Sequence, residues 1–165
     1  MIGLNLCPFA KAVHVKRLVH VAVDESVDRA ELLDWTRCEL LALRSLPESE
    51  RETSLLVMPQ ALPDFLDFND FVGDAEELLA DLGLDGEFQI ASFHPHFQFA
   101  GTDADDITNF TNRSPYPTLH LLRESSIDRA VAVFPEAEAI YETNMQTLRR
   151  LGHDGWRALD VGVHA

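Results

Sequence analysis

Histidines in the second half of the chain are the residues best suited to catalysis or metal binding. His94 and His96 lie two positions apart in "SFHPHF" (92–97), and His120 follows in "LHLLRE" (119–124). On an extended backbone the first two imidazoles project to the same side. With His120 they could bind a divalent transition metal such as zinc, iron or copper, or act as general acids and bases. A carboxylate ligand could come from the acidic run Asp103, Asp105 and Asp106.

The same histidines also have a purely structural interpretation. No helical ligand spacing such as HExxH accompanies them, and seven histidines in an acidic chain produce close pairs by coincidence. In this interpretation His94 caps the end of a strand by hydrogen bonding, and His96 faces the solvent. The sequence leaves both interpretations open.

A proline-rich segment, "TNRSPYPTLH" (111–120), could hold an arginine ready for an anion. Its two prolines fix their own φ angles and favour extended conformations in the residues before them. Such a stiff loop would present Arg113 as a bidentate donor for carboxylate or phosphate and Tyr116 as a hydrogen-bond donor. Asn109, Asn112 and His120 would complete a polar pocket. The alternative is an ordinary rigid loop whose arginine pairs with one of the many carboxylates.

Two further side chains are candidates with strong structural alternatives. Arg123 offers the same planar fork, but it stands beside Glu124, and an internal ion pair is its simpler fate. Cys7, in "LNLCPFAK", could sit at a helix start where the helix dipole favours the thiolate and makes it a nucleophile. Otherwise Cys7 is a buried anchor of the N-terminus. Cys38 lies within a helical pattern and is predicted to be a buried small hydrophobe.

Composition restricts the class of partner. The formal net charge is -15, and Lys11 and Lys16 are the only lysines, so no basic surface exists for nucleic acid or for an anionic membrane. No segment has the length of a transmembrane helix, and the start of the chain lacks the basic region of a signal peptide. Two cysteines do not make a disulfide framework. We therefore expect a cytoplasmic protein. The segment around Arg113 makes a small anionic molecule the expected ligand, and the sequence does not predict the oligomeric state.

Alternating strand and helix patterns must position these residues. Apolar runs predict strands at 16–23, 53–58 and 87–93, which we expect to be neighbours in one sheet, and helical periodicity predicts helices at 28–47 and 64–82. Residues 94–118 form a long loop, and helices follow from Ser126, with a break at Pro135, to Gly152. The tail, "WRALDVGVHA", could be a last edge strand or could be frayed. The order β-α-β-α-β, long loop, C-terminal helices predicts one α/β domain over 1–165, a small open sheet with helices packed on it. A ferredoxin-like split arrangement, with "LHLLRE" or the tail as a fourth strand, is the alternative.

Several of these motifs together resemble a known family. "GLNLCPFAK", "ASFHP", "NFTNRSPYP" and "LHLLRE" are similar to motifs of the bacterial domain-of-unknown-function family 1415, and the resemblance spans nearly the whole chain. It implies no reaction. It does place family motifs on Cys7, His94, Asn109, Asn112, Arg113, Tyr116, His120 and Arg123, and does not require histidine at position 96. It also implies that relatives carry a helix ahead of "GLNLCPFA" that this chain lacks.

Two classes of function follow. The first is an enzyme or binding protein for a small anion, in which Arg113 clamps the anion and His94 or His120 acts as acid or base. The second is a non-catalytic interaction domain that docks a partner protein through Phe97, Phe99 and Tyr116.

Overall fold

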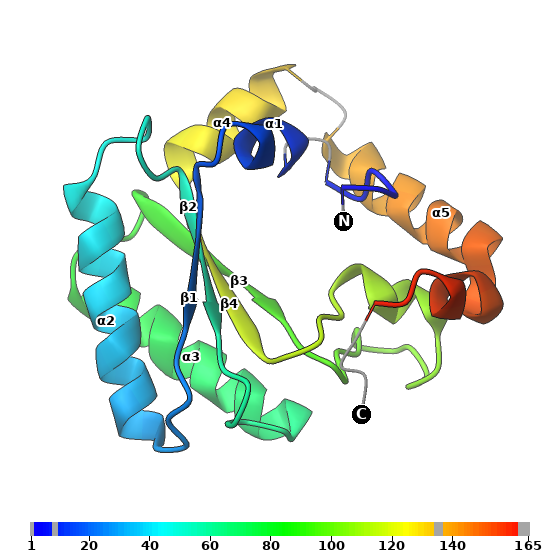
Figure 1. Ribbon diagram of the computed structural model, residues 1–165, viewed down its shortest axis with the longest axis horizontal. Coiled ribbons are helices and arrows are strands. Elements are labelled where there is room, and N and C mark those ends of the chain that lie inside the picture. The colour runs from blue at the N-terminus through cyan, green and yellow to red at the C-terminus, as the bar shows by residue number, and fades with distance from the viewer. Residues whose placement is uncertain (1, 8–9, 134–136, 162–165) are drawn as a thin grey trace.

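Figure 1 shows the computed structural model, which describes residues 2–7, 10–133 and 137–161. Four strands form one mixed sheet: β1 (Val19–Val23), β2 (Thr53–Val57), β3 (Phe88–Phe93) and β4 (Thr118–Arg123). The order is β1-β2-β4-β3. β1 is parallel to β2, and β4 is antiparallel to both of its neighbours. The predicted open α/β sheet is therefore confirmed.

The place of β4 corrects part of the prediction. The three apolar runs do share one sheet, but β2 and β3 are not neighbours, because β4 lies between them. Residues of "LHLLRE" thus supply the fourth strand, as the alternative arrangement allowed. They form a split β-α-β unit with β2 and β3 while β1 adds a parallel strand at the edge.

Two amphipathic helices cover one face of the sheet: α2 (Arg29–Ser45) and α3 (Phe65–Asp81) (Figure 1). Each begins at an aspartate whose carboxylate accepts hydrogen bonds from two amides of the first turn, Asp28 in α2 and Asp64 in α3. Between these helices and the sheet lies the core, which includes Leu32, Leu40, Leu56, Phe68, Phe71, Phe88, Leu119 and Leu121. Cys38 is exposed, so its predicted burial is wrong: it lies on the solvent side of α2.

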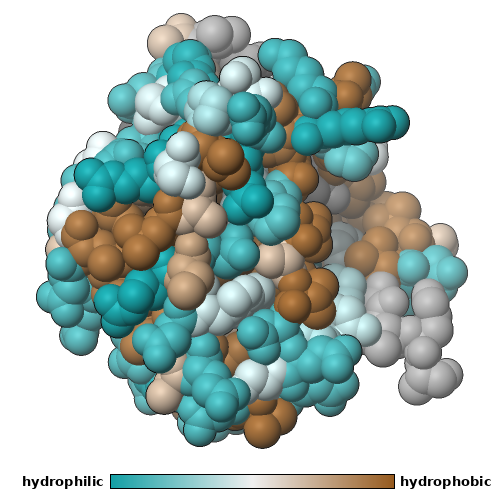
Figure 2. Space-filling model, turned by 60° about the vertical axis from the view of Figure 1, so that its left-hand side comes forward, coloured by the Kyte–Doolittle hydropathy of each residue, from teal (hydrophilic) through white to brown (hydrophobic). Residues whose placement is uncertain are grey.

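The other face of the sheet is less completely covered. Helices α1 (Ala10–Val15), α4 (Glu124–Val133) and α5 (Ala137–Ala158) form an arc on that side (Figure 1). Val21 and Val23 of β1 remain 56% and 59% exposed there. Figure 2, in which the side of the molecule that carries α2 comes forward, shows apolar residues exposed among hydrophilic ones.

The C-terminal helix was expected to end at Gly152, and its regular geometry is interrupted there. Gly152 has φ 63° and ψ 176°, and a further helical segment follows this kink within α5, to Ala158. The tail through Ala158 is thus helical and not an edge strand. The predicted break at Pro135 lies outside the described residues. Within the long loop, residues Ile107–Thr111 form a 3₁₀ helix, η1, which packs against α5.

Candidate functional site

An open cleft of about 680 Å³ lies where the long loop meets the N-terminus of α3 and the end of α5. Its polar lining residues include Arg113, His96 and His153, together with Asp64 and Asp105. Apolar surface comes from Pro63, Phe65, Leu66, Ala104 and Phe110. The cleft therefore combines one permanent cation, two imidazoles and two carboxylates around an aromatic wall.

Arg113 is fixed in this wall by neutral groups. Its Nε donates to the carbonyl of Phe97 at 3.2 Å, and its Nη2 donates to the carbonyl of Ala104 at 2.6 Å. The guanidinium carbon lies 4.2 Å from the centroid of the Phe110 ring. Partial burial lowers the pKa of Arg113, but a guanidinium stays charged at any physiological pH. No carboxylate among the described residues lies within ion-pair distance of it.

The two cleft histidines come from segments far apart in the sequence. His96 is exposed at the start of the long loop, and His153 follows the kink in α5. Edge contacts with the Phe110 ring hold this part of α5, with ring centroids 5.7 Å from His153 and 5.0 Å from Trp156. The left-handed backbone at Gly152 thus turns the helix so that His153 reaches the cleft.

The predicted asparagines build the loop and not the lining. Asn109 is fully buried: its Oδ1 accepts from the amide of Phe99 and the hydroxyl of Thr102, and its Nδ2 donates to the carbonyl of Asp103. Asn112 accepts at its backbone carbonyl from the amide of His94. Both asparagines therefore hold the backbone that carries Arg113.

His94 is a buried histidine with both ring nitrogens engaged. Its Nδ1 accepts from the amide of His96 at 3.0 Å, so the proton is on Nε2, which faces the carbonyl of Leu62 at 3.0 Å. The ring stacks on Phe68 with 5.0 Å between centroids. Desolvation by burial lowers the pKa of His94, so it is neutral at pH 7. This geometry favours the structural interpretation, because no ring nitrogen is left to bind a metal or move a proton.

His120 lies on the opposite face of the sheet from His94. In β4 its side chain is on the same face as Phe93, and the two ring centroids are 6.2 Å apart. Its Nε2 is 2.6 Å from Oγ1 of Thr53, whose hydroxyl donates to the carbonyl of Leu121. Desolvation lowers the pKa of His120 to about 4. The structure therefore does not bring His94, His120 and Arg113 together in one pocket.

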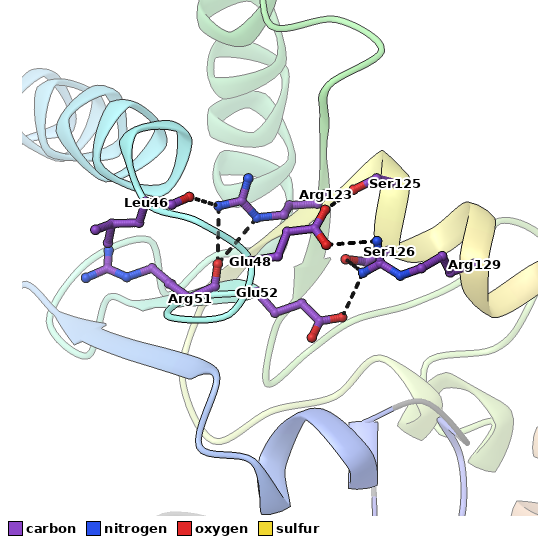
Figure 3. Close-up of polar contacts among 8 residues, drawn as sticks. All are labelled: Leu46, Glu48, Arg51, Glu52, Arg123, Ser125, Ser126 and Arg129. Carbon is purple, nitrogen blue, oxygen red and sulfur yellow. Dashed lines mark hydrogen bonds and ion pairs between the residues drawn. The ribbon is translucent and has the colours of Figure 1, made fainter.

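Arg123 is a buried support for the end of α2. Figure 3 shows its guanidinium directed at the backbone of the turn after that helix, where it donates to the carbonyls of Leu46 and Arg51. A further bond reaches the carbonyl of Leu43 at 2.6 Å. The expected ion pair with Glu124 is not formed. Instead, these bonds place a positive charge at a helix C-terminus, where it is stabilising.

Tyr116 and Cys7 also lie apart from the cleft lining. Tyr116 is 36% exposed, and its backbone carbonyl accepts from the hydroxyls of Ser114 and Thr118, which makes the proline segment a compact turn. Cys7 is partly buried in the N-terminal segment, whose carbonyl at Leu6 accepts from Asn144 of α5. Pro8 and Phe9, on which the Cys7 hypotheses also rest, lie outside the described residues.

His153, Phe110 and Asp64 line the cleft, although they were not among the predicted site residues. The signal for His153 was the glycine before it, which was interpreted as a helix end. Among the residues that the structure describes, no group of three or more histidine, cysteine or acidic side chains is arranged to hold a metal ion. In the same part of the chain, no helix is both long and apolar enough to span a membrane.

Comparison with known proteins gives the family and nothing further. No curated protein and no solved structure matches the chain significantly. A family model described as "Protein of unknown function (DUF1415)" matches residues 1–158. Because this match covers nearly all of the chain, the protein belongs to the DUF1415 family.

Proposed function

We propose that the protein binds a small anionic molecule in the cleft between the 94–113 segment and the end of α5. Arg113 is the anion ligand, and His96 and His153 contribute hydrogen bonds or exchange protons with the ligand. His94 and His120 are less suited to this role. Both ring nitrogens of His94 already have hydrogen-bond partners, and His120 lies on the opposite face of the sheet. A cytoplasmic location, in which exposed thiols such as Cys38 stay reduced, belongs to the same proposal.

One observation carries the proposal: Arg113 has no carboxylate partner in the described structure although acidic side chains outnumber lysine and arginine 28 to 13. Its bonds to two carbonyls fix the guanidinium without neutralising its charge. An anion that enters the cleft would therefore meet an oriented cation and would lose little affinity to ordering of the side chain.

The rest of the lining restricts the ligand. Asp64 and Asp105 would repel a highly charged anion, whereas Phe65 and Phe110 offer apolar contact. The lining is best matched by a molecule with one anionic group and an apolar or hydroxylated remainder. Two imidazoles beside an anion site are also sufficient for acid–base catalysis. The proposal therefore includes an enzyme that acts on the bound anion as well as a binding protein.

The interaction-domain alternative has weaker support. Phe97 and Phe99 are partly buried and contact each other at 4.9 Å between centroids. Phe97 also contacts Phe65, and Phe99 contacts Tyr141 of α5. Since these rings pack within the protein, Tyr116 is left as the exposed aromatic residue of the three.

Thermal melts with added anions test the proposal. Phosphate, sulfate and small mono- and dicarboxylates should be compared, and a fitting anion at about ten times its Kd should raise Tm by roughly 3–5 °C. Arg113→Lys keeps the charge but loses the fork, so the anion-dependent shift should fall sharply. Arg44→Lys is the matched control, because Arg44 is half-exposed on α2 and pairs with Glu87 away from the cleft. No shift in the wild type with any of these anions, or an equal shift in Arg113→Lys, would contradict the proposal.

A further inference from the structure

The outer edge of β1 presents unpaired backbone groups. Within the sheet order β1-β2-β4-β3, β1 is an edge strand, and no element is drawn in front of it in Figure 1. The carbonyl of Leu18 accepts from Glu52, and the amide of Asp24 donates to Val57, so the even-numbered residues of β1 face β2. Because backbone direction alternates along a strand, the amides and carbonyls of Val19, Val21 and Val23 point outward. Among the described residues, no backbone bond from another segment reaches them.

This edge lacks the usual protection against pairing. Natural edge strands are blocked by a charged residue, a proline or a bulge. The sequence of β1, "VHVAV", contains neither proline nor lysine nor any acidic residue. Its outward-bonding residues are also the valines of the less covered sheet face, where Val21 and Val23 are more than half exposed. The same strand thus offers both unpaired backbone hydrogen-bonding groups and exposed apolar side chains.

The residues that flank β1 determine which partner fits. Lys16 and Arg17 precede the strand, and Asp24 and Glu25 follow it. Antiparallel pairing of two copies about Val21 places Val19 of one copy opposite Val23 of the other. It also brings Arg17, which lies in a left-handed turn just before the strand, to the same end of the interface as Glu25 of the other copy. Both ends of the paired strands then match cation with anion, whereas parallel pairing would place like charges side by side. Arg17 and Glu25 are exposed and have no ion pair in the described structure.

We propose that β1 pairs with β1 of a second copy of this chain in an antiparallel, two-fold symmetric dimer. Each of the facing valine pairs would exchange two backbone hydrogen bonds, which joins the two sheets into one. Such an interface uses the same surface on both copies, so it closes at the dimer and leaves no free β1 edge. The net charge of -15 on each copy opposes association. At physiological salt, repulsion between charges more than about 8 Å apart is largely screened. The attraction between the unlike charges at the strand ends acts over a shorter distance and is therefore screened less.

Sedimentation velocity and light scattering of the full chain test this dimer at physiological ionic strength. Between about 1 and about 100 μM the wild type should change from monomer toward a mass near twice 18.5 kDa. Val21→Lys should weaken dimerisation by at least about tenfold, because two ammonium groups would face each other at the two-fold axis. Val27→Lys is the control, since Val27 is 75% exposed and lies outside the strand. A wild type that stays monomeric throughout, or a Val21→Lys variant that dimerises as well as wild type, overturns the proposal.

A charge exchange provides a second test that leaves the strand itself intact. Arg17→Glu and Glu25→Arg should each weaken the dimer severalfold, since each creates like-charge pairs at both ends of the interface. The double variant should recover most of the loss, because the pairs are restored with opposite sign. A double variant weaker than both single variants would overturn the antiparallel register, and this result remains informative even if Val21→Lys does not fold. The cleft does not include β1, so neither outcome depends on anion binding.

Discussion

The guanidinium of Arg113 lies over the ring of Phe110, with 4.2 Å between the guanidinium carbon and the ring centroid. The rings of His153 and Trp156 make T-shaped contacts with the same ring. Phe110 therefore links the loop that carries the cation with the helix that carries a cleft histidine. This contact joins two segments about forty residues apart in the sequence.

Phe110→Leu should weaken anion binding while the charge of Arg113 is kept. Leucine preserves much of the volume but removes the π face, and a partly exposed cation–π contact contributes roughly 0.5–1 kcal/mol. We expect the Kd of a cleft anion, measured by calorimetric titration, to rise about twofold to fivefold. Phe93→Leu is the control, because Phe93 lies beside His120 on the other face of the sheet. Equal affinities in wild type and Phe110→Leu would show that the ring does not position the guanidinium.

Replacement of His94 should affect stability and not ligand affinity. In His94→Leu the carbonyl of Leu62 and the amide of His96 lose their partners, which should cost about 2–4 kcal/mol in urea unfolding. His94→Gln should recover part of this loss, because its amide can both donate and accept. A fully stable His94→Leu protein that no longer binds the anion would restore His94 to the functional site.

Some elements of this fold could be predicted from the sequence, and others could not. Helices α2 and α3 were predictable because the capping residues Asp28 and Asp64 and the apolar spacing all mark the same segments. The position of β4 between β2 and β3 was not, because strand order depends on long-range pairing that short apolar runs do not encode. The exposure of Cys38 was not predicted for a related reason. The spacing of apolar residues shows that a helix has an apolar face, but it does not show whether a residue beside that face is buried or exposed.

The candidate site was predicted to a similar degree. Arg113 follows from its local context, since the residues around it form a turn that fixes the backbone. The predicted pocket combined His94 and His120 with Arg113, because the direction of each histidine side chain was predicted from its own segment without knowledge of how the strands pair. The sheet places them on opposite faces. His153 could not be assigned from local sequence, because its place depends on the packing of α5 against η1.

Acid should destabilise the protein through His120. Its pKa in the folded protein is about 4, below the ordinary value of 6.5, so the unfolded chain binds the proton more readily. The stability that depends on neutral His120 is therefore complete above pH 6.5 and is lost as the pH falls from 6.5 to 4. We expect a loss of about 2 kcal/mol, discounted from the full shift because the ring is partly exposed. In urea unfolding between pH 7 and pH 4, His120→Gln should show a smaller loss than wild type, and identical pH profiles would contradict this assignment.

Gly152→Ala should reveal what the kink in α5 contributes to the cleft. At φ 63° and ψ 176°, Gly152 occupies a region that residues with a Cβ avoid, and nothing within 4 Å would obstruct an added Cβ. The cost is therefore backbone strain, about 1–3 kcal/mol in chemical unfolding. Gly73→Ala is the matched control: Gly73 lies within α3 and also has open space around it, so alanine there should stabilise by roughly 0.5–1 kcal/mol.

If Gly152→Ala relieves its strain by straightening the helix, His153 moves away from Phe110 and the anion affinity falls, while Gly73→Ala binds as wild type does. If the variant keeps the kink, stability falls and the anion affinity stays the same. A Gly152→Ala protein with unchanged stability and unchanged affinity would mean that the left-handed conformation is not what brings His153 to the cleft.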